Sequence, residues 1–144
     1  MAGDSLGDQL AYLIASVNRR LEEELEERLR PEGVPIEQMR VLGCLAGGKE
    51  RAEGCPMGEL AESVLVDGPT LTKIIDRMVA ESLVYRAPDP HDRRRVLIYV
   101  THRGRALHRR LSGIARQQQK RLLERLDGAG ADQLKDLLRN LMAG

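Results

Sequence analysis

Arginine is concentrated in one short stretch of the chain, where its neighbours favour contact with a polyanion. The stretch reads His91, Asp92, Arg93, Arg94, Arg95. The guanidinium group is planar and weakly hydrated, and it is the group that proteins insert into a narrow minor groove of DNA. Asp92, two residues before Arg94, can hold that guanidinium in a fixed pose. We therefore expect these five residues to meet a duplex, with Asp92 positioning Arg94.

The distribution of charge supports this interpretation, although the net charge of the chain is only +1. Residues 86–110 hold eight arginines and two acids, a local net charge of +6, together with all three histidines. Five glutamates lie between residues 22 and 27. A basic region on a neutral protein is typical of a surface that meets nucleic acid at one end only. The alternative is a basic loop that serves only solubility.

A second set of polar residues precedes the basic run. Apolar residues recur at steps of three and four between residues 68 and 81, and Asp67 before them is a favoured N-cap. The opposite face of this expected helix, with its borders, holds Pro69, Thr70, Thr72, Lys73, Asp76 and Arg77. Hydroxyls and free backbone N–H groups at a helix start bond phosphates or base edges, and lysine reaches phosphate or guanine. The same residues also suit the solvated face of an ordinary surface helix, so this helix alone decides nothing.

Hydrophobic periodicity and turn residues predict the elements that position these two sets. The expected order is helices over residues 6–29, 35–46, 56–64 and 68–81, a hairpin with strands over 83–86 and 96–100, and helices over 101–126 and 134–141. The hairpin is expected to carry a long loop, with the three arginines at its tip. Thr101 is the expected N-cap of the long helix that follows, and Asp127 and Gly128 break that helix.

This order predicts a mainly α fold, of the α+β kind, that contains a winged helix-turn-helix. In such a lobe the second helix enters the major groove and the hairpin reaches the backbone or the minor groove. We expect one intertwined domain in three parts: an N-terminal dimerisation helix over residues 1–34, the DNA-binding lobe over 35–100, and C-terminal dimerisation helices over 101–144.

Long apolar stripes in a short chain predict a homodimer. The stripes over residues 6–29 and 107–126 are longer than one small lobe can cover. A twofold dimer would place two recognition helices about 34 Å apart, which matches a pseudo-palindromic operator in double-stranded DNA. The alternative is a monomer that folds both stripes onto itself.

Several runs resemble the signature of the MarR family of bacterial regulators. These are Val66–Lys73, Asp76–Met78, Leu83–Val84, Asp89–Arg94 and Val100–Gly104. The resemblance covers nearly the whole chain, because the flanking helices also have the family's order and lengths. It implies that the first and last helices of two chains interlock, that the helix over residues 68–81 reads the major groove, and that Arg94, supported by Asp92, enters the minor groove.

The resemblance also implies a function. The family usually acts by repression, relieved when a small anion, often aromatic or phenolic, binds between the dimer region and the DNA-binding lobe. The spacing of residues does not place that effector pocket in this chain. The sequence departs from the family pattern at Ser82, where a glycine usually stands, and at Cys55, where Thr or Ser is common.

Two cysteines, Cys44 and Cys55, are too few for a disulfide framework or a metal site. Cys55 is expected at a helix start, where its thiolate would be stabilised, so an oxidant-sensing repressor on the same scaffold is an alternative. The plainer interpretation has Cys44 as a small core residue and Cys55 as an exposed cap.

Other candidate sites carry little weight. Residues 3–7 match an esterase-like Gly-Asp-Ser-Leu-Gly pattern, but no strand precedes them and no histidine follows an aspartate at the spacing of those esterases. His102 and His108 lie on different faces of one helix, which is poor for a shared metal. Arg19 and Arg40 would either meet an effector carboxylate or pair with the glutamate cluster. We expect no enzyme activity, no cofactor and no metal.

No apolar run approaches the length of a membrane span, and the N-terminus lacks the pattern of a secretion signal, so a cytoplasmic protein is expected. The expected partners are therefore duplex DNA, a second copy of the chain and a small effector. A rival from another class is a protein–protein adaptor that uses the winged fold without DNA.

Overall fold

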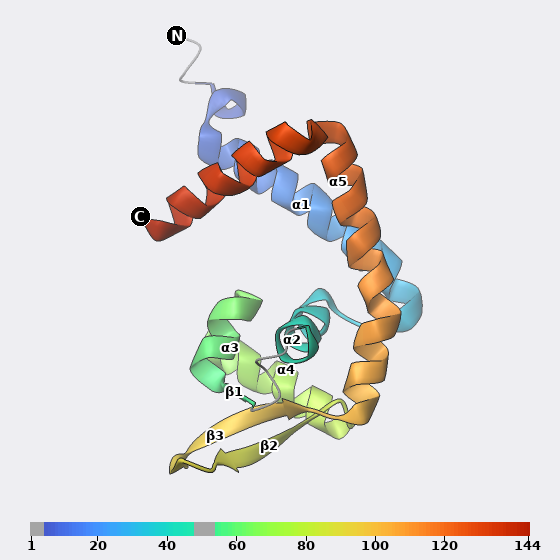
Figure 1. Ribbon diagram of the computed structural model, residues 1–144, viewed down its shortest axis with the longest axis vertical. Helices are drawn as coiled ribbons and strands as arrows, with labels where there is room; N and C mark the ends of the chain where they lie inside the picture. The colour runs from blue at the N-terminus through green and yellow to red at the C-terminus, as the bar shows by residue number, and fades with distance from the viewer. Residues whose placement is uncertain (1–4, 48–53) are drawn as a thin grey trace. The chain divides into compact units, whose positions relative to one another are not determined.

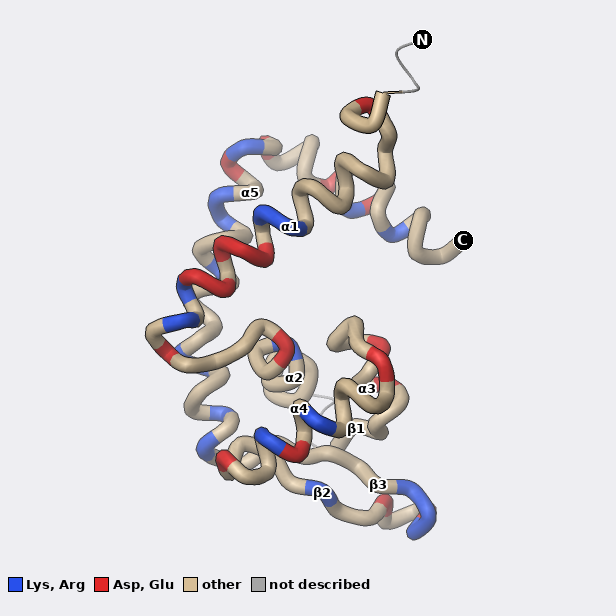
Figure 2. Tube along the Cα trace, turned by 180° about the vertical axis from the view of Figure 1, so that it is seen from behind, with Lys and Arg blue, Asp and Glu red and all other residues tan. Residues whose placement is uncertain are grey.

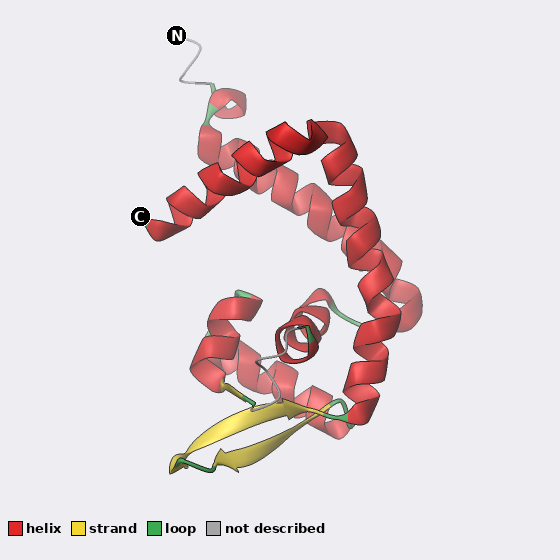
Figure 3. Ribbon diagram, viewed as in Figure 1, coloured by secondary structure: helices red, strands yellow, loops and turns green. Residues whose placement is uncertain are grey.

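The computed structural model describes residues 5–47 and 54–144 (Figures 1 and 3). Its elements in chain order are the 3-10 turn η2 (Leu6–Asp8), α1 (Leu10–Leu29), the 3-10 turn η3 (Arg30–Glu32), α2 (Ile36–Ala46), β1 (Cys55–Pro56), α3 (Met57–Val64), α4 (Gly68–Ala80), β2 (Val84–Asp89), β3 (Asp92–Val100) and α5 (His102–Ala143). The predicted fold class, mainly α with a winged helix-turn-helix, is confirmed.

The chain divides into two compact units, Met1–Leu111 and Ser112–Gly144. The first holds α1 to α4, the sheet and the first ten residues of α5, and the second holds the rest of α5. The predicted division at residues 34 and 100 into a lobe and two dimerisation parts stays a prediction.

The core of the first unit is built from aliphatic side chains, as a chain without Phe or Trp requires. Fully buried residues from α2, α3, α4 and β3 include Leu42, Leu45, Leu60, Val64, Leu71, Ile75, Met78 and Ile98. Figure 1 shows the three helices on one side of the sheet. The apolar stripe of α4 faces this core, which leaves its polar face exposed.

The sheet has three antiparallel strands in the order β1-β3-β2. The two-residue strand β1 pairs Cys55 with Ile98 and Pro56 with Leu97. We had expected a helix start at Cys55, and this was wrong. A strand of two residues has no alternation to detect, and its partner lies more than forty residues away in the sequence.

The wing is longer and its turn tighter than the sequence predicts. Strands β2 and β3 pair from Val84–Val100 up to Asp89–Asp92, and only Pro90 and His91 lie between them. The expected long loop between residues 86 and 96 was therefore wrong. Prolines and a charged run disfavour strands, but β2 is an edge strand, which tolerates proline.

Thr101 caps α5, as predicted, and also ties it to the start of the wing. The Thr101 hydroxyl accepts a hydrogen bond from the Gly104 amide at 2.9 Å and donates to the carbonyl oxygens of Ser82 (2.7 Å) and Leu83 (3.0 Å). The predicted break at Asp127 is confirmed by its non-helical backbone, and its carboxylate accepts from the Gly130 amide at 2.7 Å to cap the last helical segment.

Candidate nucleic-acid interface

The start of α4 is exposed to solvent and capped by a side chain of its own chain. The predicted N-cap is confirmed, because the Asp67 carboxylate accepts from the Thr70 amide at 2.7 Å. Hydrogen bonds from the Thr70 hydroxyl and amide lower the pKa of Asp67 below its ordinary value of 3.8, and the charge of Lys73 lowers it further. Pro69 lies in the first turn, where its missing N–H costs nothing.

The five predicted contact residues of this helix lie on its exposed face: Pro69, Thr70, Thr72, Lys73 and Arg77. Besides Thr70, which bonds the Asp67 carboxylate, two of them also have partners within the chain. The Thr72 hydroxyl donates to the Gly68 carbonyl at 3.1 Å, and the Arg77 guanidinium pairs with the Glu81 carboxylate at 2.9 Å. Lys73 lies exposed in the middle of this polar face.

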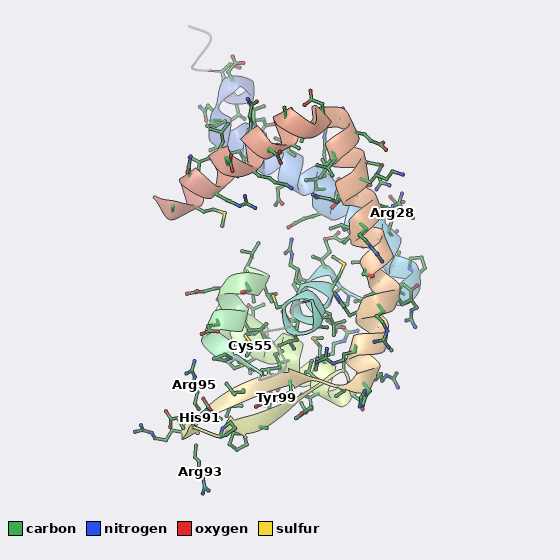
Figure 4. The ribbon with its side chains drawn as sticks, viewed as in Figure 1. Arg28, Cys55, His91, Arg93, Arg95 and Tyr99 are labelled. Carbon is green, nitrogen blue, oxygen red and sulfur yellow. The ribbon has the colours of Figure 1, made fainter. Side chains whose placement is uncertain are left out.

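The three arginines of the wing form a bulge near its tip. Val96 pairs with Pro88 and Asp92 pairs with Asp89, so Arg93, Arg94 and Arg95 have no opposite residue on β2. A bulge re-aims side chains away from the regular alternation of a strand. Figure 4 shows Arg93 and Arg95 extending from the tip in different directions.

Within the bulge, Asp92 holds Arg94 as the sequence predicts it should. The Asp92 carboxylate accepts from the Arg94 backbone amide at 3.1 Å and from its Nε at 3.4 Å. The Arg94 side chain is nevertheless 93% exposed. The Arg94 guanidinium is thus oriented by Asp92 but remains exposed to solvent, which suits a side chain that binds a ligand.

The remaining wing residues have weaker restraints. The His91 amide donates to the buried Asp89 carboxylate at 2.9 Å, which closes the turn, and the His91 ring is exposed. Arg95 lies 3.9 Å from the Glu59 carboxylate of α3. Figure 2 shows the positive charge gathered at this tip, while acidic residues line α1.

One further contact joins the two predicted surfaces, and sequence reasoning missed it. The Arg86 guanidinium of β2 forms an ion pair with the Asp76 carboxylate of α4. The sequence places Asp76 on the polar face of this helix but names no partner for it. The two residues lie ten positions apart across a turn whose angle the sequence does not give, so no pattern signalled the pair.

The cysteines lie in different environments from those expected. Cys55 is fully buried in β1, so its expected role as an exposed helix cap was wrong, and its thiol lies 3.6 Å from the Pro56 carbonyl. Cys44 is partly exposed on α2. A buried thiol in apolar surroundings resists ionisation and oxidation. Oxidant sensing through Cys44 and Cys55 stays untested.

Arg19 and Arg40 both pair with the glutamate cluster of α1. Arg19 contacts Glu23 at 3.0 Å one turn away, and Arg40 contacts Glu22 at 3.0 Å, which joins α2 to α1. These pairs favour the structural interpretation of both arginines over an effector contact.

Histidines and acids make no further site in the described part of the chain. Burial lowers the pKa of His108, with the charge of Arg109 adding to the effect. Within residues 5–47 and 54–144, no three His, Cys, Asp or Glu side chains gather as metal ligands would. Nor is any helix in those ranges apolar over a length that would cross a membrane. Part of the esterase-like pattern and residues 48–53 lie outside the described residues.

Each unit also exposes an apolar stripe. On η2 and α1 the side chains of Leu6, Leu10, Leu13, Ile14 and Val17 are 40–65% exposed. On the last helical segment, Leu134, Leu137, Leu138, Leu141 and Met142 are 38–84% exposed. Large side chains exposed together on one stripe are typical of an interaction surface.

Comparison with known proteins identifies the family to which a chain with this fold and this arginine-bearing wing belongs. A family model described as the MarR family matches residues 32–95. The chain belongs to the MarR family of transcriptional regulators. It is 35% identical over 100 residues to the multiple antibiotic resistance protein MarR of Escherichia coli (strain K12). That alignment covers 68% of this chain and 65% of the relative, just under two thirds of the relative's length.

Solved structures of MarR-family proteins match nearly the whole chain. CouR from Rhodococcus jostii RHA1, bound to p-coumaroyl-CoA, is 27% identical with a TM-score of 0.84, covering 96% of this chain and 94% of CouR. The repressor CouR bound to a 23-mer DNA duplex has a TM-score of 0.82 at 24% identity, covering 97% of this chain and 96% of that one. At that identity the second likeness speaks to the fold alone.

Proposed function

We propose that this MarR-family chain is a sequence-specific, DNA-binding transcriptional repressor that acts as a homodimer. The observation that carries the proposal is Arg94, which is held by Asp92 and yet 93% exposed at the end of the wing. A pre-oriented guanidinium loses less side-chain entropy when it enters a groove. Its electrostatic attraction to a narrow minor groove is strong.

The recognition helix α4 supplies the second contact. Thr70, Thr72, Lys73 and Arg77 all lie on its exposed face, beside a first turn that Asp67 caps. In our proposal α4 reads base edges in the major groove while the wing, with His91 and Arg93 to Arg95, grips the neighbouring backbone and minor groove.

A second copy of the chain is the proposed occupant of the exposed leucine stripes. The stripe of α1 and that of the last helical segment are each apolar along one side and polar elsewhere, which is the pattern of a helix that packs on a partner. A twofold dimer presents two α4 helices and two wings, which predicts a pseudo-palindromic operator.

A small anionic or phenolic effector is proposed to release the DNA. CouR, at 27% identity, is a MarR-family relative with p-coumaroyl-CoA bound, which is an aromatic anion. We rank oxidant sensing second because Cys55 is fully buried. A phenolic acid would release DNA in the first case. In the second, only peroxide would do so, and dithiothreitol would reverse its effect.

Selection from a random-sequence duplex library tests the proposal. We expect an inverted repeat to be enriched, and binding to weaken steeply with salt. Lys73→Ala should lower the slope of log affinity against log salt by about one unit, since it removes one phosphate contact. Lys135→Ala, which removes an exposed lysine from the last helical segment, is the matched control and should leave the slope unchanged.

Failure to enrich any duplex would contradict DNA binding and favour a protein–protein adaptor, whose interactions would survive Arg94→Ala. Enrichment of a site without twofold symmetry would contradict the dimer.

A further inference from the structure

The ion pair between Asp76 and Arg86 spans the two surfaces that we propose to meet DNA. Asp76 belongs to α4 and Arg86 to β2, the first strand of the wing. Along the chain these elements are joined only by residues 81–83. Ser82 in that turn has a left-handed backbone with φ of 62°. The ion pair therefore adds a polar side-chain link between helix and wing to the turn and the shared apolar core.

The ion pair between Asp76 and Arg86 is expected to contribute little to the stability of the fold. The Asp76 side chain is 62% exposed and the Arg86 side chain 35% exposed. Exposed pairs of this kind contribute little to folding, because solvent screens the attraction and holding two side chains in one geometry costs entropy.

The position of Asp76 gives a better reason. Its carboxylate lies on the exposed face of α4, three residues after Lys73 and beside Arg77. A lone carboxylate on a surface that meets phosphates repels them. Arg86 neutralises it from the wing, so the acid is tolerated there only while the wing stays close to the helix.

The position of Arg86 links the pair to the arginine bulge. Arg86 pairs with Ile98 across the hairpin and lies three residues before Asp89, whose pairing with Asp92 begins the bulge. Fixing Arg86 against α4 therefore fixes β2 and, through the pairing of β2 with β3, the strand from which Arg93, Arg94 and Arg95 extend.

We propose that Asp76 and Arg86 are positioning residues that hold the wing at a set distance from the recognition helix. This rests on the proposed DNA-binding function and adds a determinant of specificity to it. Two contact sites held at a fixed separation bind one duplex together, which raises the affinity. That increase in affinity is lost when the separation between the two sites varies. The pair should then favour the matched operator over unrelated DNA, while non-specific binding depends only on total charge.

The test compares binding to the selected operator with binding to a scrambled duplex of the same composition. For Asp76→Asn and for Arg86→Gln, we expect the specificity ratio to fall about tenfold, within the range of single-contact losses at such interfaces. The double variant Asp76→Arg with Arg86→Asp rebuilds the pair in reverse and should recover most of the ratio.

Glu81→Gln is the matched control. It removes the same negative charge and breaks another exposed ion pair, between Glu81 at the C-cap of α4 and Arg77 four residues earlier. The link between the wing and α4 is left intact, and the freed charge of Arg77 should strengthen binding to both duplexes alike, so the specificity ratio should stay within about twofold of the parent.

Two results would overturn the proposal. If Asp76→Asn and Glu81→Gln shift both duplexes by the same factor, the pair supplies only charge. If the reversed pair is no better than the single variants, the contact itself does not matter. Amide hydrogen exchange gives a readout without DNA, and residues 84–89 should exchange faster in Asp76→Asn than in Glu81→Gln. If the parent binds no duplex, the proposed function is wrong, whereas a parent that binds with an unchanged ratio in Asp76→Asn refutes only the positioning role.

Discussion

The base and the tip of the wing are made from the same two strands, yet they are held in opposite ways. At the base, Leu83 and Val84 are buried, Tyr85 stacks on Tyr99 with ring centroids 5.1 Å apart, and Thr101 bonds two carbonyls of the turn. At the tip, three arginines bulge out of the pairing and one carboxylate orients Arg94.

This difference separates the two tasks of the wing. The base carries packing and satisfied hydrogen bonds, so changes there should alter stability first. The tip carries exposed charge, so changes there should alter binding and leave stability nearly untouched. Substitutions at the base of the wing, at the cap of α4 and at the tip can separate effects on stability from effects on binding.

The tightest point of the base is Gly104, and Gly104→Ala should destabilise the fold by about 3 kcal/mol, at the upper end of overpacking costs. A Cβ atom there would lie 2.2 Å from the Leu83 carbonyl oxygen and 2.7 Å from a Val100 methyl. The clash involves backbone, which cannot swing away. Chemical denaturation measures the loss. The control is Gly113→Ala, where an added Cβ meets nothing within 4 Å.

Thr101→Val should cost about 2 kcal/mol, because it removes a helix cap and the hydrogen bonds to two turn carbonyls while keeping the side-chain shape. Thr101→Ser keeps the hydroxyl and should recover most of that loss in the same denaturation experiment. Equal losses in both variants would show that packing of the methyl group holds the base.

The agreement between sequence and structure follows the same division. Helix α4, its Asp67 cap and the Thr101 cap were predictable because helix period and capping act over three or four residues. The length of the wing, strand β1 and the Asp76–Arg86 pair were not, because each depends on a partner brought near only by the fold. Asp92 and Arg94 were predictable at the tip because they lie two residues apart.

Ser82 offers a gain in stability at the base. Its φ of 62° is a conformation that side chains disfavour and glycine does not. Ser82→Gly should therefore stabilise the fold by about 0.5–1 kcal/mol, the relief of strain less the added freedom of the unfolded chain. Ser82→Ala keeps the strain and should give no such gain in a thermal melt.

The smallest effect concerns the cap of α4 and its pH dependence. The folded-state pKa of Asp67 is lowered by its bonds with Thr70. Its contribution is thus complete above pH 3.8 and is lost as pH falls through the lower folded value. The melting temperature of Asp67→Asn should converge on that of the parent under acid conditions. A difference that grows as the pH falls would contradict the cap.

Arg94→Ala gives the most direct test of the central claim, that the tip of the wing exists to hold DNA. Its melting temperature and its affinity for the selected operator should be measured on the same preparation. We expect an unchanged melting temperature and binding weakened by about 1–3 kcal/mol. Unchanged binding, or a fall in stability that accounts for the weaker binding, would contradict the account.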